Sequence, residues 1–248
     1  MTKFLEILDD KSELVKRALK ISVNCIQEAI AKRGKCSIAL AGGSTPKPLY
    51  EKLAAQNLDW NNIYIFWGDE RYVPADHPDS NEKMAREAWL NQCPIPAQNI
   101  FPMPTGADPA TDAATYEQTL QDFFGSQDNV GFDLMFLGMG DDGHTASLFP
   151  QTAALDVGDR LVAVGQKQED SRITLTLPTI NASHNIIFLV AGANKQDALQ
   201  QVFHEDCDPK DYPSKFIQPK EGRLWWLLDA AAGEKLSPDG AIYAMKSR

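Results

Sequence analysis

The sequence predicts an α/β fold of three layers, in which a largely parallel, Rossmann-like sheet lies between helices on both of its faces. Short apolar segments alternate with segments of helical periodicity along most of the 248 residues. The segment 132–137 is apolar nearly throughout, as is typical of a strand buried on both faces of a sheet. The alternation continues across a stretch with four prolines at 94–108, so we expect one domain over residues 1–248.

The first half of the chain is expected to open with a long helix over residues 10–33, where Leu14, Ala18, Ile21 and Cys25 recur at helical spacing. A short apolar strand at 36–41 follows. Pro46 is suited to the first position of the next helix, because no amide hydrogen is needed there. The further elements expected in this half are a helix at 46–55, a strand at 63–67 and a helix at 81–91.

The second half is expected to be richer in strands. The proline-rich stretch predicts a surface connection, and a helix at 111–124 is expected after it. The elements that follow are strands at 132–137, 161–164, 173–177, 185–190 and 224–228, a helix at 195–203 and a short alanine-rich helix. In such sheets ligands bind beyond the carboxyl ends of the strands, so we expect the site at that edge.

Composition and charge exclude several classes of function. A formal net charge of −10 without a basic run argues against nucleic acid as a partner. No apolar run reaches the ~18 residues that cross a bilayer. Four acidic residues interrupt residues 1–20, so we expect neither a membrane anchor nor a secretory signal. Four cysteines without a CxxC pair predict reduced thiols in a cytoplasmic protein, and the sequence offers no metal-ligand cluster, so neither metal nor cofactor is expected.

The first candidate loop, residues 41–46, lies between a strand and a helix and reads Ala-Gly-Gly-Ser-Thr-Pro. Gly42 and Gly43 allow the backbone to turn sharply and to approach a ligand closely. Ser44 or Thr45 is suited to cap the helix, and free amides at a helix N-terminus beside two hydroxyls make an anion site. A plain tight turn explains the two glycines equally well, and the lysine of a Walker A loop is missing.

The second candidate segment follows the strand at 63–67 and contains Asp69, Glu70 and Arg71. From spacing alone, a solvated loop is the simpler interpretation. Because the segment follows a strand beside the first loop, we expect Asp69 and Arg71 to face the same cleft.

The third candidate loop follows the strand at 132–137 and matches GxGxxG, with glycines at 138, 140 and 143. A dinucleotide site is rejected because Asp141 and Asp142 would lie against a pyrophosphate, and because Pro150 ends the long helix that the pattern requires. The loop instead presents His144 shortly after two carboxylates, which suits a general base near neutral pH. A lone histidine is more often structural, yet of the four histidines this one alone follows three glycines at the functional edge.

Two further cations are expected at the same edge. Lys195 follows directly after the strand at 185–190. Arg172 begins a segment in which apolar and polar residues alternate, and it reaches this edge if that strand runs antiparallel to the others. For either residue taken singly, an exposed side chain without a role is an equally good interpretation.

At these residues the sequence resembles the 6-phosphogluconolactonases, from about residue 36 to 232. The resemblance implies a three-layer parallel-sheet fold shared with glucosamine-6-phosphate deaminases and ribose-5-phosphate isomerases. The sequence departs from the family at 168–171, where prolines are common. The motifs are Gly42-Gly43-Ser44-Thr45-Pro46; Asp69-Glu70-Arg71 with Val73-Pro74 and Asp79-Ser80-Asn81; Gly138-Met139-Gly140; Asp142-Gly143-His144-Thr145-Ala146-Ser147-Leu148-Phe149-Pro150; Arg172-Ile173-Thr174; Lys195; and Trp226 with Asp229-Ala230-Ala231.

The resemblance implies hydrolysis of 6-phospho-D-glucono-1,5-lactone to 6-phospho-D-gluconate in the oxidative pentose phosphate pathway, by a monomer or a small homo-oligomer. It implies His144 as the base that activates water and Asp142 as the group that orients it. If His144 is not the base, Asp69 is the next candidate. The oxyanion would be held by loop amides or by Arg71. The phosphate would be held by the first loop, with Gly42, Gly43, Ser44 and Thr45, and by Arg172 and Lys195.

Two rival functions are weighed against this resemblance. Sugar-phosphate deaminases carry an acidic residue five positions after the histidine and a tyrosine after Asp-Glu, whereas this chain has Phe149 and Arg71 there. A sugar-phosphate sensor would need a DNA-binding module, for which the sequence has no basic segment. The lactonase interpretation is favoured over both.

Overall fold

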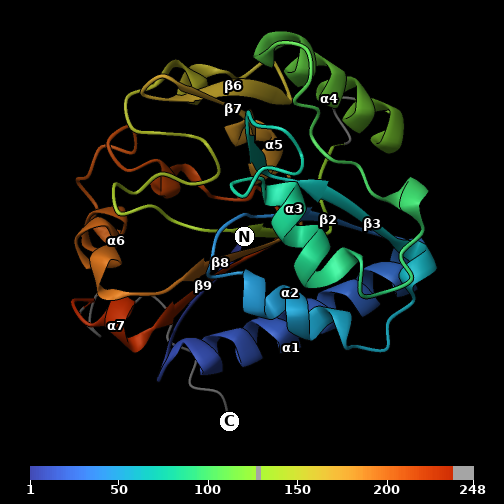
Figure 1. Ribbon diagram of the computed structural model, residues 1–248. Coiled ribbons are helices and arrows are strands. Elements are labelled where there is room, and N and C mark those ends of the chain that lie inside the picture. Colours follow the sequence, from blue (N-terminus) through green and yellow to red (C-terminus); the bar gives the residue numbers. More distant parts are fainter. Residues whose placement is uncertain (127–129, 237–248) are drawn as a thin grey trace.

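A computed structural model describes residues 1–126 and 130–236 of the chain (Figure 1). Its centre is a six-stranded sheet in the order β1-β9-β8-β5-β2-β3, in which every neighbouring pair is parallel. Its strands are β1 (Thr2–Leu8), β2 (Cys36–Leu40), β3 (Ile63–Trp67), β5 (Leu134–Leu137), β8 (Asn185–Val190) and β9 (Arg223–Asp229).

Helices cover both faces of this sheet. They are α1 (Lys11–Arg33), α2 (Lys47–Ala54), α3 (Asn81–Ala85), α4 (Pro109–Phe124), α5 (Leu177–Asn181), α6 (Gln196–Phe203) and α7 (Ala230–Gly233). Figure 1 shows α1 and α2 together on one face of the sheet. On this face, the ring of Tyr50 of α2 packs against Phe136 of β5. On the opposite face, the aromatic end of α4 packs on β3, and Phe203 of α6 packs on Trp226 of β9. The predicted three-layer α/β fold is confirmed.

A small antiparallel sheet stands beside the large one. Its order is β4-β7-β6, and its strands are β4 (Asp69–Arg71), β6 (Val162–Lys167) and β7 (Asp170–Leu175). β4 begins two residues after β3 ends, so the small sheet extends from the carboxyl edge of the large one. The strands expected at 161–164 and 173–177 therefore belong to this sheet, and Arg172 lies on an antiparallel strand.

Local sequence explains where the long helices begin and end. At the start of α1, the side chain of Asp10 accepts a hydrogen bond from the amide of Glu13 at 2.9 Å. The helix ends at Gly34, whose φ of 73° is left-handed. α4 repeats this pattern, because Asp108 caps its first turn and Gly125 (φ 87°) ends it. The remaining short helical turns are η1 (Trp60–Asn62), η2 (Arg86–Leu90, a π-helical turn), η3 (Ala97–Asn99), η5 (Ala153–Asp156), η6 (Ala193–Lys195) and η7 (Pro213–Phe216).

Several elements differ from the prediction. β1 was not expected, because charged Lys3 and Glu6 interrupt its apolar residues; its strand character comes from pairing with β9 at the sheet edge. β4 was expected as a loop, and it pairs with β7. The helix expected at 81–91 is α3 followed by the π-helical turn η2. Among the described residues, no helix combines the length and the apolar character needed to cross a lipid bilayer.

Candidate active site

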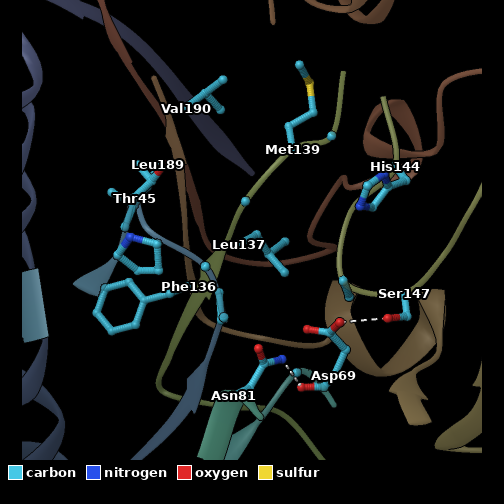
Figure 2. A pocket seen from close by; sticks show the side chains of 18 of the residues that line it. Thr45, Asp69, Asn81, Phe136, Leu137, Met139, His144, Ser147, Leu189 and Val190 are labelled. Carbon is cyan, nitrogen blue, oxygen red and sulfur yellow. Dashed lines mark hydrogen bonds between the residues drawn. The ribbon is translucent and has the colours of Figure 1, made fainter. Parts of the chain in front are cut away.

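A cavity of about 460 Å³ opens at the carboxyl ends of β2, β3, β5 and β8 (Figure 2). This volume is in the range of small-molecule sites. The loops that follow these strands line the cavity together with residues of β6 and β7. The sequence-predicted residues in this lining are Gly42, Gly43, Ser44, Thr45, Asp69, Arg71, His144, Arg172 and Lys195.

The first loop, after β2, differs from the prediction in how the helix starts. We expected Ser44 or Thr45 to cap α2, but the cap is Pro46, and no side chain makes a capping hydrogen bond. The reason is that residues 44–46 form a turn before the helix begins at Lys47. Gly43, with a φ of 96°, holds the left-handed conformation that lets the chain turn here.

Asp69 and Arg71 both line the cavity, whereas Glu70 points away from it. The Asp69 carboxylate accepts a hydrogen bond from the Ser147 hydroxyl at 2.6 Å (Figure 2). Glu70 accepts hydrogen bonds from the backbone amides of residues 71, 81 and 82 and so ties β4 to the start of α3. Its burial raises the pKa of this carboxyl, against those amide hydrogen bonds. Glu70 thus has a structural role, because it fixes the position of β4 relative to α3.

His144 and Asp142 form a hydrogen-bonded pair in the loop after β5. Nδ1 of His144 lies 2.5 Å from Oδ1 of Asp142, which also accepts the His144 amide at 3.0 Å. Burial alone would raise the pKa of Asp142, but the hydrogen bond and charge of His144 outweigh it and lower that pKa to about 2. An ionised carboxylate only accepts hydrogen bonds, so Nδ1 carries the proton. In the neutral ring Nε2 is therefore a proton acceptor.

The glycine loop is shaped around this histidine. A Cβ on Gly140 would lie 2.1 Å from Nδ1 of His144, so only glycine allows the ring to pack here. The Gly140 amide donates a hydrogen bond to the His144 carbonyl at 2.9 Å. The centroids of the Phe149 ring and the His144 imidazole are 4.5 Å apart. Among the described residues, Asp141, which we also considered as a partner of the histidine, makes no hydrogen bond to it. Residues 144–150 form turns and not the helix of a dinucleotide site.

Two arginines face the cavity from paired positions of the small sheet. Arg71 of β4 and Arg172 of β7 are register partners. Burial and then the charge of Arg71 lower the pKa of Arg172, and Nε of Arg172 is buried without a hydrogen-bond partner among the described residues. Lys195 ends the turn η6 after β8. The cavity therefore holds cations whose charges are not fully compensated, which suits an anionic ligand.

Comparison with known proteins identifies the family. Residues 9–226 match the family described as glucosamine-6-phosphate isomerases/6-phosphogluconolactonase. The chain belongs to this family.

Related proteins agree with this assignment. The chain is 56% identical over 243 residues to a protein of Synechocystis sp. named 6-phosphogluconolactonase, covering 96% of this chain and 100% of the relative. A solved structure of 6-phosphogluconolactonase from Trypanosoma brucei aligns with a TM-score of 0.81 at 31% identity, covering 95% of this chain and 99% of the other. A monomeric glucosamine-6-phosphate deaminase, at 22% identity and a TM-score of 0.79, shares the fold.

Sequence reasoning gave no role to some residues that line the cavity of this family member, although Asn81 and Ser147 belong to the motifs of the family resemblance. Lys167, Ser147 and Asn81 all line it. Lys167 and Asp170 are register partners in the β6–β7 hairpin, so their side chains lie on the same face of the small sheet. Arg172 lies two residues further along β7, and its side chain is therefore on that face too. The antiparallel register is the signal that could have located Lys167, and one sequence does not supply that register.

Replacement of Gly42 by alanine is expected to disturb the site of this family member. A Cβ at this position would lie 1.7 Å from Oδ1 of Asn81, which is buried and donates from Nδ2 to the Asp69 carbonyl at 2.8 Å. Overpacking of this kind lowers the free energy of unfolding by about 1–3 kcal/mol. Chemical denaturation measures this loss. Gly158→Ala is the matched control, because, apart from the chain neighbours, no atom of the described residues lies within 4 Å of a Cβ there. Equal stability of the two variants would contradict the prediction.

Proposed function

We propose that the chain hydrolyses 6-phospho-D-glucono-1,5-lactone to 6-phospho-D-gluconate, as a step of the oxidative pentose phosphate pathway in the cytoplasm. The observation that carries the proposal is the presence, in one cavity, of a carboxylate-bound histidine and of the Arg71–Arg172 pair with Lys195. A base beside an anion site is what hydrolysis of a phosphorylated lactone requires. The names of the relatives point to the same substrate.

In the proposed mechanism, His144 acts as a general base and Asp142 orients it. Nε2 of the neutral ring removes a proton from water while the water oxygen forms a bond to the lactone carbonyl carbon. The tetrahedral oxyanion then collapses, the bond from this carbon to the ring oxygen breaks, and the imidazolium returns the proton to that oxygen. The Asp142 carboxylate keeps Nδ1 protonated and stabilises the positive ring between the two steps.

The remaining predicted residues are proposed to bind the substrate. Arg172 and Lys195 would hold the phosphate together with Ser44, Thr45 and the backbone of Gly42 and Gly43. Arg71 or loop amides would hold the oxyanion. Asp69 is the alternative base, although its carboxylate already accepts the Ser147 hydroxyl.

The direct test is acid release from freshly prepared 6-phospho-D-glucono-1,5-lactone, with the spontaneous rate subtracted at each pH. We expect turnover well above the spontaneous rate. Ammonia release from glucosamine 6-phosphate, without lactone hydrolysis, would instead support the deaminase alternative. Gel filtration decides between the two proposed states, a monomer and a small homo-oligomer.

Replacing Arg172 or Lys195 by methionine is expected to lower kcat/KM for the phosphorylated lactone by roughly 10- to 150-fold. The reason is the loss of a charge-assisted contact of about 1.5–3 kcal/mol. Unphosphorylated gluconolactone should lose far less, because it has no phosphate to bind. Lys52→Met, at an exposed position of α2, is the control. Equal losses on both substrates would show that these residues do not bind the phosphate.

A further inference from the structure

A second cavity of about 220 Å³ lies between β1, β9, the end of α6 and the turn η7. Among the described residues, it shares no lining residue with the candidate active site. Leu5, Val202 and Ile217 supply apolar walls, and each of these three residues is buried. The cavity is therefore small and largely apolar, and the charged groups in its lining are unusual in such surroundings.

Two ammonium groups face this cavity and have no carboxylate partner in the part of the chain that the structure describes. Nζ of Lys3 stands 4.8 Å from the centre of the Phe203 ring. Lys215 donates hydrogen bonds to the backbone carbonyls of His204 and Glu205. No ion pair involves either lysine among the described residues, and the exposed Glu205 is the one carboxylate in the described lining.

The ammonium group of Lys3 is partly buried and has a second positive charge, that of Lys215, near it. Burial, and then the charge of Lys215, lower the pKa of Lys3. An anion in the cavity would reverse both effects, because it would supply the missing opposite charge. The apolar walls favour an anion with an apolar body over a fully hydrated one such as phosphate.

The turn η7 joins this cavity to the histidine loop. Ser214 is buried and lines the cavity. Its amide donates to the Gly143 carbonyl at 2.9 Å, and its hydroxyl donates to the His144 carbonyl at 3.3 Å. A Cβ on Gly143 would lie 2.7 Å from the Tyr212 ring, so the two segments are packed against each other. A shift of η7 would therefore move the backbone that carries His144.

We propose that this second cavity binds a small monocarboxylate with an apolar body, and that its occupancy is transmitted to the His144 loop through Ser214. The carboxylate pairs with Lys3, and the apolar body lies between Phe203 and the aliphatic wall. This site is separate from the proposed lactone site. The proposed carboxylate binding can therefore be tested independently of the proposed hydrolysis.

Isothermal calorimetry with benzoate tests the binding. For a ligand of this size we expect a dissociation constant on the order of 1 mM. Lys3→Met should weaken binding by at least about 10-fold, because it removes the charge and keeps a side chain of similar length. Lys20→Met, at an exposed position of α1, should bind benzoate as the unaltered protein does.

Benzyl alcohol, which lacks the charge, and inorganic phosphate, which lacks the apolar body, should each bind far more weakly. Undiminished binding by Lys3→Met, or equal binding of the three probes, would overturn the assignment.

Histidine ring resonances test the transmission without any activity assay. The chain has four histidines, of which His204 lines this cavity and His144 lines the candidate active site. At constant pH, benzoate should shift the signals of both, while those of His77 and His184 stay in place. In Ser214→Ala, benzoate should still shift the His204 signal, and the shift of the His144 signal should be smaller, because the variant loses the hydroxyl contact to the His144 carbonyl and keeps the amide contact to Gly143. A stationary His144 signal in the unaltered protein, beside a shifting His204 signal, would refute the coupling.

Discussion

Replacing His144 by alanine is expected to lower kcat for the phosphorylated lactone by about 10²- to 10⁴-fold, the usual contribution of general-base catalysis. The melting temperature should change little. The side chain is 23% exposed and faces the cavity, so its removal enlarges the cavity and leaves the core filled. Turnover with the spontaneous rate subtracted and thermal unfolding are the two measurements.

The matched control is His184→Ala, because His184 is also exposed and lies just before β8, at the opposite edge of the sheet. Binding of 6-phosphogluconate by calorimetry should be retained in His144→Ala, since the cations of the cavity are unchanged. Near-normal turnover of His144→Ala would show that another residue is the general base, and Asp69 is the next candidate. A variant that no longer folds would show that His144 is structural.

Replacing Asp142 by asparagine is expected to lower kcat by at least 10-fold, up to the full loss expected for His144→Ala. The pKa of about 2 means that the carboxylate is ionised throughout the working pH range, so it always accepts from Nδ1. Asparagine has nearly the same shape but also presents an NH₂ donor, which permits the wrong tautomer of the imidazole. In a serine hydrolase triad this change lowers kcat by ~10⁴-fold.

A double-mutant cycle separates orientation from an independent role. If Asp142 acts through His144, the double variant His144→Ala, Asp142→Asn should be no slower than His144→Ala alone. Additive losses would mean that Asp142 contacts the substrate itself. Asp141→Asn is the control, because among the described residues this neighbouring carboxylate makes no hydrogen bond to His144.

The local patterns of the sequence were sufficient to predict many of the residues that line the cavity. Residues 42–45, Asp69, His144 and Lys195 each follow a strand of the large sheet directly or by a short loop. Because the strands of that sheet are parallel, their carboxyl ends meet at one edge, and these residues line one cavity there. The capping role expected of Ser44 or Thr45 was wrong, because the turn at 44–46 delays the helix. β1 escaped prediction because an edge strand with charged residues has a weak hydrophobic pattern.

By itself, the sequence determined the alternation of strands and helices and the position of His144 on a glycine loop, since both depend on neighbours a few residues apart. The residue spacing left both Asp141 and Asp142 open as partners of the histidine and the family resemblance favoured Asp142, but only the tertiary structure shows the contact between the Asp142 carboxylate and the imidazole. It also decided that Ser147 binds Asp69, 78 residues away in the chain, and that the register of the small sheet places Lys167 beside Arg172. Contacts of this kind depend on how separate elements pack, and no periodicity within a single segment records that packing.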